Sequence, residues 1–380
     1  MRANPLTVRR LCRPLKYPGP SAREGAPVDF AELSAFRPRI EAAVRAHYRA
    51  AYPRAPAAVR EYLRLGEDLS LRGGKRFRAL LVLAGFHAAN GRDPSPAIEV
   101  AAGLEHFQTW MLIHDDIIDH SEERRGGPAV HREAAALHVR GGGAGDPSNV
   151  GEGIAITLGD VEEPYVVDTF LRTPVPLPAR LAALQEYAEM TRQTAYGQLL
   201  DIRNGTLPPS RVSESDVFRV HELKSAVYTV VSPLKIGALL AGSPPGQLRD
   251  LDRIGRDIGI AFQLRDDVLG AGFDAGDTGK SSNDLTEGKR TLLVVDAWAR
   301  ASRGDRRRIT SVLGNPSASE REVEAVRAII RTTGSLEHSE RSIARLSRRA
   351  LRRLKASRTI RANAKPLLRE IAGRLVERRA

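Results

Sequence analysis

The sequence Leu112-Ile113-His114-Asp115-Asp116-Ile117-Ile118-Asp119 places three carboxylates at the end of an otherwise apolar run. Upstream, apolar side chains recur three and four residues apart, which predicts one long buried helix. Asp115 and Asp119 are four residues apart and therefore share a face of that helix, and Gln108 lies two turns earlier on the same face. Carboxylates buried side by side are costly unless cations neutralise them, and hard oxygen ligands of this kind favour Mg²⁺.

A second acidic pair closes another apolar helix far along the chain, in Phe262-Gln263-Leu264-Arg265-Asp266-Asp267. Thr278-Gly279-Lys280, Asp284 and Gly288-Lys289-Arg290 come after it. Two acidic helix ends that face inward in a helical bundle can hold metal ions between them. Because chance seldom repeats such a pair, this repetition is the strongest functional signal in the sequence.

Basic residues accompany the acids. In Gly73-Gly74-Lys75-Arg76-Phe77-Arg78, two glycines permit a tight turn into a helix, and Lys75 and Arg78 share a face at its predicted start. A helix N-terminus with two cations suits a diphosphate. Arg124-Arg125-Gly126 lies within ten residues of the first acids, as expected if both groups bind one polyanion. An exposed basic helix start and a surface salt-bridge cluster are the alternatives for each motif alone.

Two weaker polar groups lie in apolar helices, namely Lys224-Ser225 and the pair Gln198 and Asp201. A buried Gln or Asp is more often a satisfied core residue than a functional one. Neither group carries an argument alone.

The net charge of +13 is unevenly distributed. Residues 1–30 carry +4 and residues 341–380 carry +12, so the remainder is slightly acidic. The body of the chain therefore does not have the charge of a nucleic-acid-binding protein. The C-terminal charges could contact RNA or an anionic membrane surface, although a solvated helix face is the commoner meaning. One cysteine, Cys12, excludes an internal disulfide and fits a reducing cytoplasm.

Almost every segment after residue 28 has helical periodicity, and none alternates with a period of two. We expect one all-α domain over residues 29–380, after an Arg- and Pro-rich disordered extension over residues 1–28. No apolar run is expected to span a membrane, because Ser232, Pro233 and Lys235 interrupt the longest candidate. The expected helices cover residues 29–52, 55–67, 75–90, 96–119, 130–140, 152–170, 179–204, 213–222, 224–241, 246–271, 288–302, 319–332, 337–356 and 360–378.

In this order, the motifs resemble those of the trans-isoprenyl diphosphate synthase (polyprenyl synthetase) family over about residues 35–375. The resemblance also covers Gly197-Gln198 with Asp201, and Lys224-Ser225. It implies an all-α isoprenoid-synthase bundle of long helices around a central cavity, a cytoplasmic homodimer, and Mg²⁺ as cofactor. The implied reaction joins isopentenyl diphosphate head to tail to an allylic diphosphate, with no nucleic-acid partner and no membrane span.

The resemblance also implies roles for single residues. Those expected in catalysis are Asp115, Asp116, Asp119, Asp266, Asp267, Lys224 and Lys280. Those expected to hold Mg²⁺ are Asp115, Asp119 and Asp266. Those expected to bind the two diphosphates are Lys75, Arg78, Gln108, Arg124, Arg125, Lys224, Ser225, Gln263 and Lys280.

The sequence departs from the family pattern at two positions. Gly270 stands where many relatives have a third aspartate, which removes one possible ligand and leaves more of the work to Asp266. Ser225 stands where Thr is commoner. We expect neither change to abolish activity.

Product length is expected to depend on Trp110 and Met111, five and four residues before Asp115. Trp110 lies about 7.5 Å along the helix axis from Asp115. In the family, a bulky aromatic there forms the floor of the pocket for the growing chain. The expected product is geranylgeranyl diphosphate, with farnesyl diphosphate second. Core packing is the alternative role for Trp110.

Two functions of other classes are weighed against this one. A class I terpene cyclase shares the first acidic motif, but it would not need Gly73–Arg78, and its usual second metal motif is absent. A non-catalytic partner subunit of a heteromeric synthase usually loses one acidic motif, whereas here the first is intact and the second nearly so.

Overall fold

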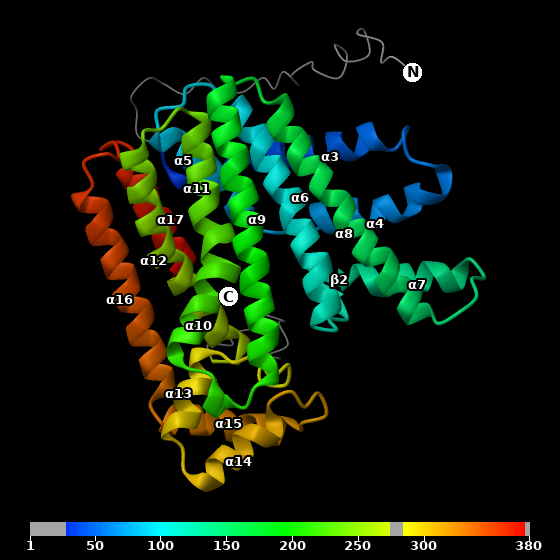
Figure 1. Ribbon diagram of the computed structural model, residues 1–380, viewed down its shortest axis with the longest axis vertical. Coiled ribbons are helices and arrows are strands. Elements are labelled where there is room, and N and C mark those ends of the chain that lie inside the picture. Colours follow the sequence, from blue (N-terminus) through cyan, green and yellow to red (C-terminus); the bar gives the residue numbers. More distant parts are fainter. Residues whose placement is uncertain (1–27, 274–283, 377–380) are drawn as a thin grey trace. The chain divides into compact units, whose positions relative to one another are not determined.

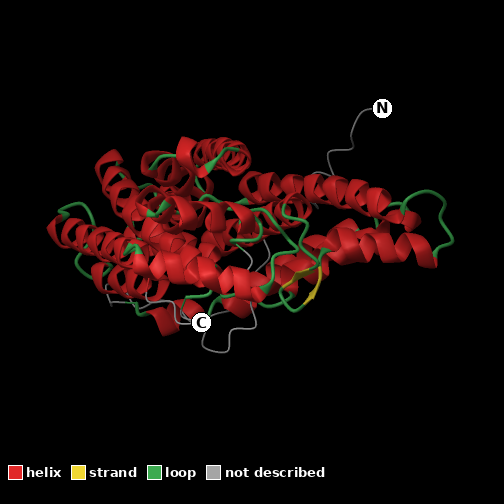
Figure 2. Ribbon diagram, turned by 90° about the horizontal axis from the view of Figure 1, so that it is seen from below, coloured by secondary structure: helices red, strands yellow, loops and turns green. Residues whose placement is uncertain are grey.

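The computed structural model describes residues 28–273 and 284–376. Within this part of the chain nearly all regular structure is helical, and Figure 2 shows one short pair of strands. The predicted all-α fold class is therefore confirmed. The predicted N-terminal extension, apart from residue 28, and Lys280 lie outside the described residues.

The chain forms two compact units, labelled by element in Figure 1. Unit 1 extends to Leu184 and also includes Ile236–Ser243. Unit 2 comprises Gln185–Lys235 and the chain from Pro244 onwards. That residues 29–380 form a single domain stays a prediction.

Unit 1 is built around α6, which is buried on nearly all sides from Pro96 to Thr109 and packs against α3, α5 and α8. A helix that is apolar all round belongs in the centre of a bundle. Gly103 permits close approach of α8, because a Cβ there would lie 2.4 Å from Thr169 Oγ1. The elements are α2 (Phe30–Ser34), α3 (Arg37–Ala51), η1 (Ala57–Val59), α4 (Arg60–Leu71), α5 (Phe77–Ala88), α6 (Ser95–Ile118), β1 (Glu123–Arg124), β2 (Gly127–Pro128), α7 (Val130–Arg140), α8 (Pro147–Arg172) and the start of α9 (Leu177–Thr206).

Unit 2 is built around α12, which packs against η3, α16 and α17. Its core includes Leu264, Val268, Leu292, Ile330 and Leu346. The elements after α9 are η2 (Pro209–Arg211), α10 (Glu214–Val220), η3 (His221–Val231), α11 (Ser232–Leu240), α12 (Pro245–Gly270), α13 (Leu292–Arg300), α14 (Arg303–Val312), α15 (Glu320–Thr332), α16 (Ser335–Ala356) and α17 (Lys365–Val376). The part of α11 from Ile236 onwards belongs to unit 1.

Four elements differ from the sequence prediction. The helix predicted over 29–52 is split into α2 and α3, with Pro38 in the first turn of α3. Helix α14 was not predicted, because only Ile309 and Val312 of its residues are buried. The hairpin of β1 and β2 was also missed, since two residues per strand are too few to show alternation. Helices predicted over 213–222 and 224–241 are continuous, through a π-helical stretch at η3.

This continuity also corrects the expectation that no apolar run could span a membrane. By length and composition Glu214–Leu240 could do so, because Pro233 falls in the first turn of α11 and does not end the helix. However, 72% of its most apolar window is buried within the protein, as in the core helix of a globular bundle. It is weak evidence for a membrane span.

Candidate active site

The first acidic group closes helix α6 in unit 1. Asp115 and Asp116 lie in its last turn, and Asp119 is its C-cap residue. Asp116 is fully buried, whereas Asp115 and Asp119 are half-buried. The C-terminal end of a helix carries the negative pole of its dipole. Three carboxylates at that end make the negative electrostatic potential stronger. This helix end is suited to bind cations.

A hairpin supplies one of these cations. Arg124, on β1, donates from Nε to Asp116 Oδ1 at 2.7 Å. Burial raises the pKa of the Asp116 carboxyl, and the neighbouring Arg124 opposes that rise. Arg72 braces the hairpin by donating from Nη1 to the carbonyl oxygens of Arg124 and Pro128. The turn requires left-handed backbone at Gly126, where φ is 74°.

Arginines gather beside this hairpin. The pKa of Arg125 is lowered to about 10, chiefly by burial and in addition by the positive charges of Arg76, Arg78 and Arg124, against the opposing effect of Glu105. Several guanidinium groups packed this closely repel one another. The arrangement is therefore ready for a polyanion.

The opening basic motif has a different geometry from the predicted one. Helix α5 begins at Phe77, so Lys75 precedes the helix and does not lie in its first turn. Arg76 is the N-cap residue, with left-handed backbone at φ 53°. Its buried side chain pairs with Glu105 at 2.8 Å and Glu41 at 3.2 Å. Arg76 fixes the start of α5, a role that the sequence did not reveal.

Several buried side-chain polar atoms in unit 1 have no hydrogen-bond partner among the described residues, and two of them belong to predicted site residues. One is Oε1 of Gln108, a residue that is only 6% exposed, and the other is Oδ2 of Asp116. Buried polar atoms are nearly always paired, so an orphaned one marks a place for a ligand, water or ion. Both lie on α6, in the half of the helix that ends in the acidic group.

The second acidic group closes helix α12 in unit 2. Asp266 is half-buried and Asp267 is buried. Gln263 donates from Nε2 to Asp267 Oδ1 at 2.9 Å, and His221 Nε2 lies 3.0 Å from Asp267 Oδ2. Gln263 therefore positions this carboxylate, and its expected contact with a diphosphate stays a prediction. Among the described residues, no group of three or more His, Cys, Asp or Glu side chains forms a metal-binding cluster.

The space beside Gly270 is occupied by another carboxylate. A Cβ at Gly270 would lie 2.0 Å from Asp284 Oδ2. Asp284 also accepts a hydrogen bond from Lys289 at 3.0 Å, and burial raises its pKa to about 6. The missing third aspartate of the motif thus leaves no empty space, because Asp284 lies where the side chain of residue 270 would begin.

Lys224 and Ser225 lie in the π-helical stretch η3. Lys224 donates from Nζ to Asp201 Oδ2 of α9 at 2.6 Å. Gly197 permits this approach, because a Cβ there would lie 2.2 Å from the backbone nitrogen of Lys224. The π-helix is rare, and where it occurs it is frequently found at functional sites, so this eleven-residue stretch is consistent with a functional role for the position.

Trp110 and Met111 are half-buried on α6. Trp110 contacts the ring of Phe107 edge-on, with centroids 5.8 Å apart. It also packs against α8 at Gly159, where a Cβ would lie 3.1 Å from the indole. Trp110 therefore fills the space between α6 and α8.

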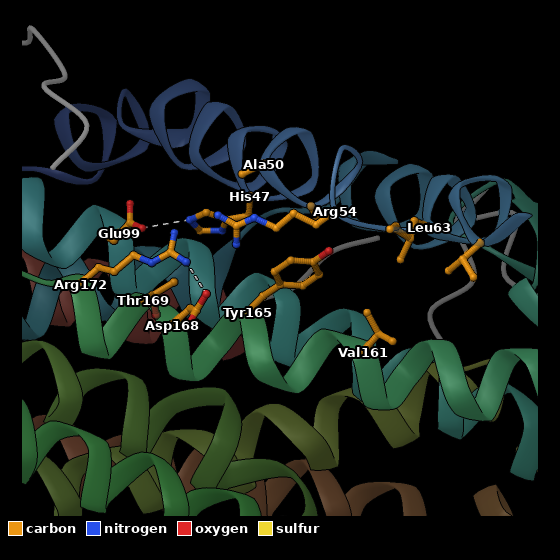
Figure 3. A pocket seen from close by; sticks show the side chains of 13 residues that line it. His47, Ala50, Arg54, Leu63, Glu99, Val161, Tyr165, Asp168, Thr169 and Arg172 are labelled. Carbon is orange, nitrogen blue, oxygen red and sulfur yellow. Dashed lines mark hydrogen bonds and ion pairs between the residues drawn. The ribbon is translucent and has the colours of Figure 1, made fainter. Parts of the chain in front are cut away.

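A separate pocket of about 300 Å³ lies in unit 1 between α3, α6 and α8 (Figure 3). None of the predicted site residues lines it. Figure 3 shows His47 paired with Glu99, and Asp168 with Arg172, along its wall. Most of its charged groups are thus already matched, and the pocket is not part of the acidic sites.

A buried hydrogen-bond network lies behind this pocket. His106 Nδ1 lies 2.7 Å from Glu162, and His106 Nε2 lies 3.1 Å from His47 Nδ1. Burial lowers the pKa of His106, so its neutral ring donates to Glu162 and accepts from His47. His47 Nε2 in turn lies 3.0 Å from Glu99 Oε1. The network is internally satisfied and serves as structure.

Comparison with known proteins gives three consistent matches. The sequence model of the polyprenyl synthetase family matches residues 60–330. A short chain isoprenyl diphosphate synthase of Methanothermobacter thermautotrophicus is 35% identical over 278 residues, which are 73% of this chain and 78% of the relative. A geranylfarnesyl diphosphate synthase of Aeropyrum pernix is 31% identical over 80% of this chain and 91% of its own length.

Solved structures give the same result. The crystal structure of a geranylgeranyl pyrophosphate synthase from Corynebacterium glutamicum, complexed with isoprenyl diphosphate and magnesium, superposes with a TM-score of 0.84. It is 34% identical in sequence, and the match covers 91% of this chain and 99% of the other.

Proposed function

The chain belongs to the polyprenyl synthetase family, and on this premise we propose how its residues divide the work of the reaction. It is a prenyltransferase of the trans-prenyl diphosphate synthase type. Such an enzyme joins isopentenyl diphosphate to an allylic diphosphate. The acids at the ends of α6 and α12 act on the allylic diphosphate, and the arginines beside the hairpin bind isopentenyl diphosphate.

The observation that carries the second assignment is the group of arginines around Arg125. Its lowered pKa reflects burial beside other cations, a repulsion that a diphosphate relieves. Lys75 and Arg78 come from the start of α5, and Gln108 adds a buried amide with an orphaned oxygen. We assign these four residues to isopentenyl diphosphate.

We propose Mg²⁺ as the cofactor, held by Asp115, Asp119 and Asp266. The donors fit, because hard carboxylate oxygens at the negative ends of two helices suit a small hard cation. When bound, the metal neutralises the charge that develops on the departing diphosphate. Asp116 and Asp267 support the sites from within, each held by partners of its own.

The protein's own cations share that work. In our assignment Arg124, Lys224 and Lys280 contact the allylic diphosphate, with Ser225 close to Lys224. Preorganised cations lower the barrier most where negative charge builds during bond cleavage. Lys224 is held by Asp201, which fixes its direction before substrate arrives. The apolar helix faces keep water from the carbocation that cleavage leaves.

We propose geranylgeranyl diphosphate as the main product, with farnesyl diphosphate second. In this proposal Trp110 limits the product length from a position about 7.5 Å along the axis from Asp115. Its contacts with Phe107 and with α8 at Gly159 fit the alternative role in core packing as well. The relatives make products of more than one length, so product analysis decides this point.

The test is a set of incubations of purified protein with Mg²⁺, isopentenyl diphosphate and one of dimethylallyl, geranyl or farnesyl diphosphate. The dephosphorylated alcohols are then sized by gas chromatography. We expect geranylgeraniol to predominate and products at least one isoprene unit longer from Trp110→Ala. Met111→Ala changes the second residue on which product length is expected to depend, and its products are sized beside those of Trp110→Ala. Unchanged lengths in Trp110→Ala would contradict the role of Trp110.

Two outcomes would overturn the assignment as a whole. A cyclic hydrocarbon formed from an allylic diphosphate alone would indicate a terpene cyclase. No turnover with any substrate pair would indicate a partner subunit that needs a second chain.

We propose that the protein is a homodimer in the cytoplasm. Within residues 28–273 and 284–376, eight of the eleven exposed large apolar side chains lie on α7, α8 and α9, among them Val139, Ile156, Leu171 and Leu199. Exposed apolar side chains concentrated on a few helices are typical of an interface between copies. A single cysteine fits a reducing compartment. Light scattering coupled to size-exclusion chromatography tests the dimer.

A further inference from the structure

The C-terminal helices carry the most one-sided charge in the protein. Between residues 341 and 369 the sequence has eleven Lys and Arg residues and no Asp or Glu. Most of these cations lie on α16, which Figure 1 shows beside α12 and α17. In the body of the chain the numbers of acidic and basic residues are nearly equal, so this segment differs from the rest in its net charge.

Five of these cations form one line on α16, which we name the cationic face: Arg341, Arg345, Arg348, Arg352 and Lys355. Their spacings of four and three residues place them within about 80° of the helix circumference and along about 21 Å of its length. All five are exposed. The opposite side of α16 is apolar and buried through Ile343, Leu346, Ala350 and Leu354. The helix is therefore anchored by one side, and from Arg341 onwards its other side is lined by cations, with one acid, Glu337, a turn before them.

The remaining arginines of α16 behave differently. Arg349 and Arg353 lie on its flank and bind the buried carboxylate of Asp257, at 2.6 and 2.7 Å. No ion pair or hydrogen bond of a cationic-face side chain occurs among the described residues. The two arginines on the flank are thus paired within the protein, whereas the side chains of the cationic face are exposed.

We propose that the cationic face docks the enzyme on an anionic lipid surface. Each Lys or Arg close to such a surface adds to the electrostatic attraction between the protein and the anionic lipids. An aligned row of cations along one rigid helix can meet a flat surface together. Leu351, 36% exposed beside the row, adds an apolar contact.

The chemistry of the proposed function favours lipid over nucleic acid. If the enzyme makes a diphosphate with a long hydrocarbon tail, its product partitions into membranes. An enzyme docked on a membrane would then release this product at the surface that takes it up. Single-stranded nucleic acids are bound largely by stacking on aromatic rings. Residues 335–376 contain no Phe, Tyr or Trp. The docking itself does not depend on the reaction, so binding is measured without substrate.

The test is co-sedimentation of the full chain with vesicles of 30% phosphatidylglycerol in phosphatidylcholine, compared with pure phosphatidylcholine, at low salt. The variant is the quadruple change Arg341→Gln, Arg345→Gln, Arg348→Gln and Arg352→Gln. Each cation contributes roughly 5-fold, so the variant loses on the order of 100-fold or more in affinity for anionic vesicles. Binding of the unaltered chain weakens as salt rises, because the Debye length falls.

A matched control removes the same charge elsewhere, by changing Arg49, Arg303, Arg307 and Arg321 to Gln. These arginines are exposed on α3, α14 and α15. The control retains vesicle affinity within about 5-fold. Circular dichroism and thermal unfolding verify that both variants fold, and turnover without vesicles stays unchanged in both.

Three results would overturn the proposal. One is the absence of a preference for anionic vesicles. Another is an equal loss of affinity in the variant and the control, which would mean that only net charge matters. The third is binding of double-stranded DNA or RNA at physiological salt that is tighter than vesicle binding and is lost in the same variant. Loss of vesicle binding with full turnover leaves the proposed function intact, so the two failures are distinguishable.

Discussion

The acidic ends of α6 and α12 are built from the same residue type but are balanced differently. At the end of α6, the buried Asp116 is neutralised by Arg124, a permanent cation eight residues later on the hairpin. At the end of α12, the buried Asp267 is held by the amide of Gln263 and by His221, an imidazole that carries a charge only when protonated. The end of α6 therefore has a permanent counter-charge within the protein. Among the described residues the end of α12 has none beside Asp267, so more of its negative charge is available to bind added cations.

Because of this difference, we expect single aspartates at the two helix ends to contribute unequally to catalysis. The end of α6 offers two half-buried carboxylates, Asp115 and Asp119, besides the buried one. The end of α12 has one half-buried aspartate, Asp266, because Asp267 is buried and residue 270 is glycine. We therefore expect the end of α12 to tolerate less change.

The largest expected effect is on turnover. Asp266→Asn is expected to lower kcat by about 10³-fold, since it removes the main cation ligand of its helix end. Asp119→Asn, the control at the other end, is expected to lower kcat by about 10²-fold, because Asp115 remains. Steady-state kinetics across a Mg²⁺ titration measures both. Equal losses would mean that the two ends contribute alike.

The next effect is on stability. Arg124→Gln leaves a charged Asp116 buried without its partner and is expected to lower the free energy of unfolding by about 3 kcal/mol. The corresponding change at the other end, Gln263→Leu, removes a neutral donor and costs about 1 kcal/mol. Urea unfolding without metal measures both. If the cost of Arg124→Gln comes from the unpaired charge of Asp116, the double variant with Asp116→Asn recovers most of the lost free energy of unfolding.

The smallest effect is a pH dependence confined to the end of α12. Burial raises the pKa of Asp284 from 3.8 to about 6, so between these values the folded chain holds a proton that the unfolded chain has released. Stability therefore falls as pH rises through this window, by at most about 1.4 kcal/mol per pH unit. Asp284→Asn removes this slope. Thermal unfolding of both proteins at pH 4.5 to 7 measures it, and parallel curves would contradict the assignment.

The features of the candidate site that depend on residues close together in the sequence were predictable. Apolar periodicity that ends in aspartates identified the last turns of α6 and α12, and the basic motif before α5 was found by its glycines. The fold class could be inferred from the same periodicity. These features involve neighbours along one helix, which spacing can report.

Partners from distant segments were not predictable. His221 lies 46 positions from Asp267, and no local pattern distinguishes it from a core histidine. The surroundings of Gly270 were equally hidden, because only the folded chain shows Asp284 in the space that a side chain there would enter. In the sequence Arg76 is one cation among three, whereas in the folded chain it is buried against Glu105. Each of these is a tertiary contact, for which sequence spacing carries no signal.

The π-helical stretch His221–Val231 makes this part of the chain sensitive to insertions and deletions. Each residue of an α-helix turns the chain by about 100°, so deleting one residue here would let the segment relax to an α-helix and rotate its N-terminal half relative to its C-terminal half. Lys224 would then point away from Asp201, although every residue type in the site was retained. Among relatives, we expect substitutions in this segment to be tolerated more often than a change in its length.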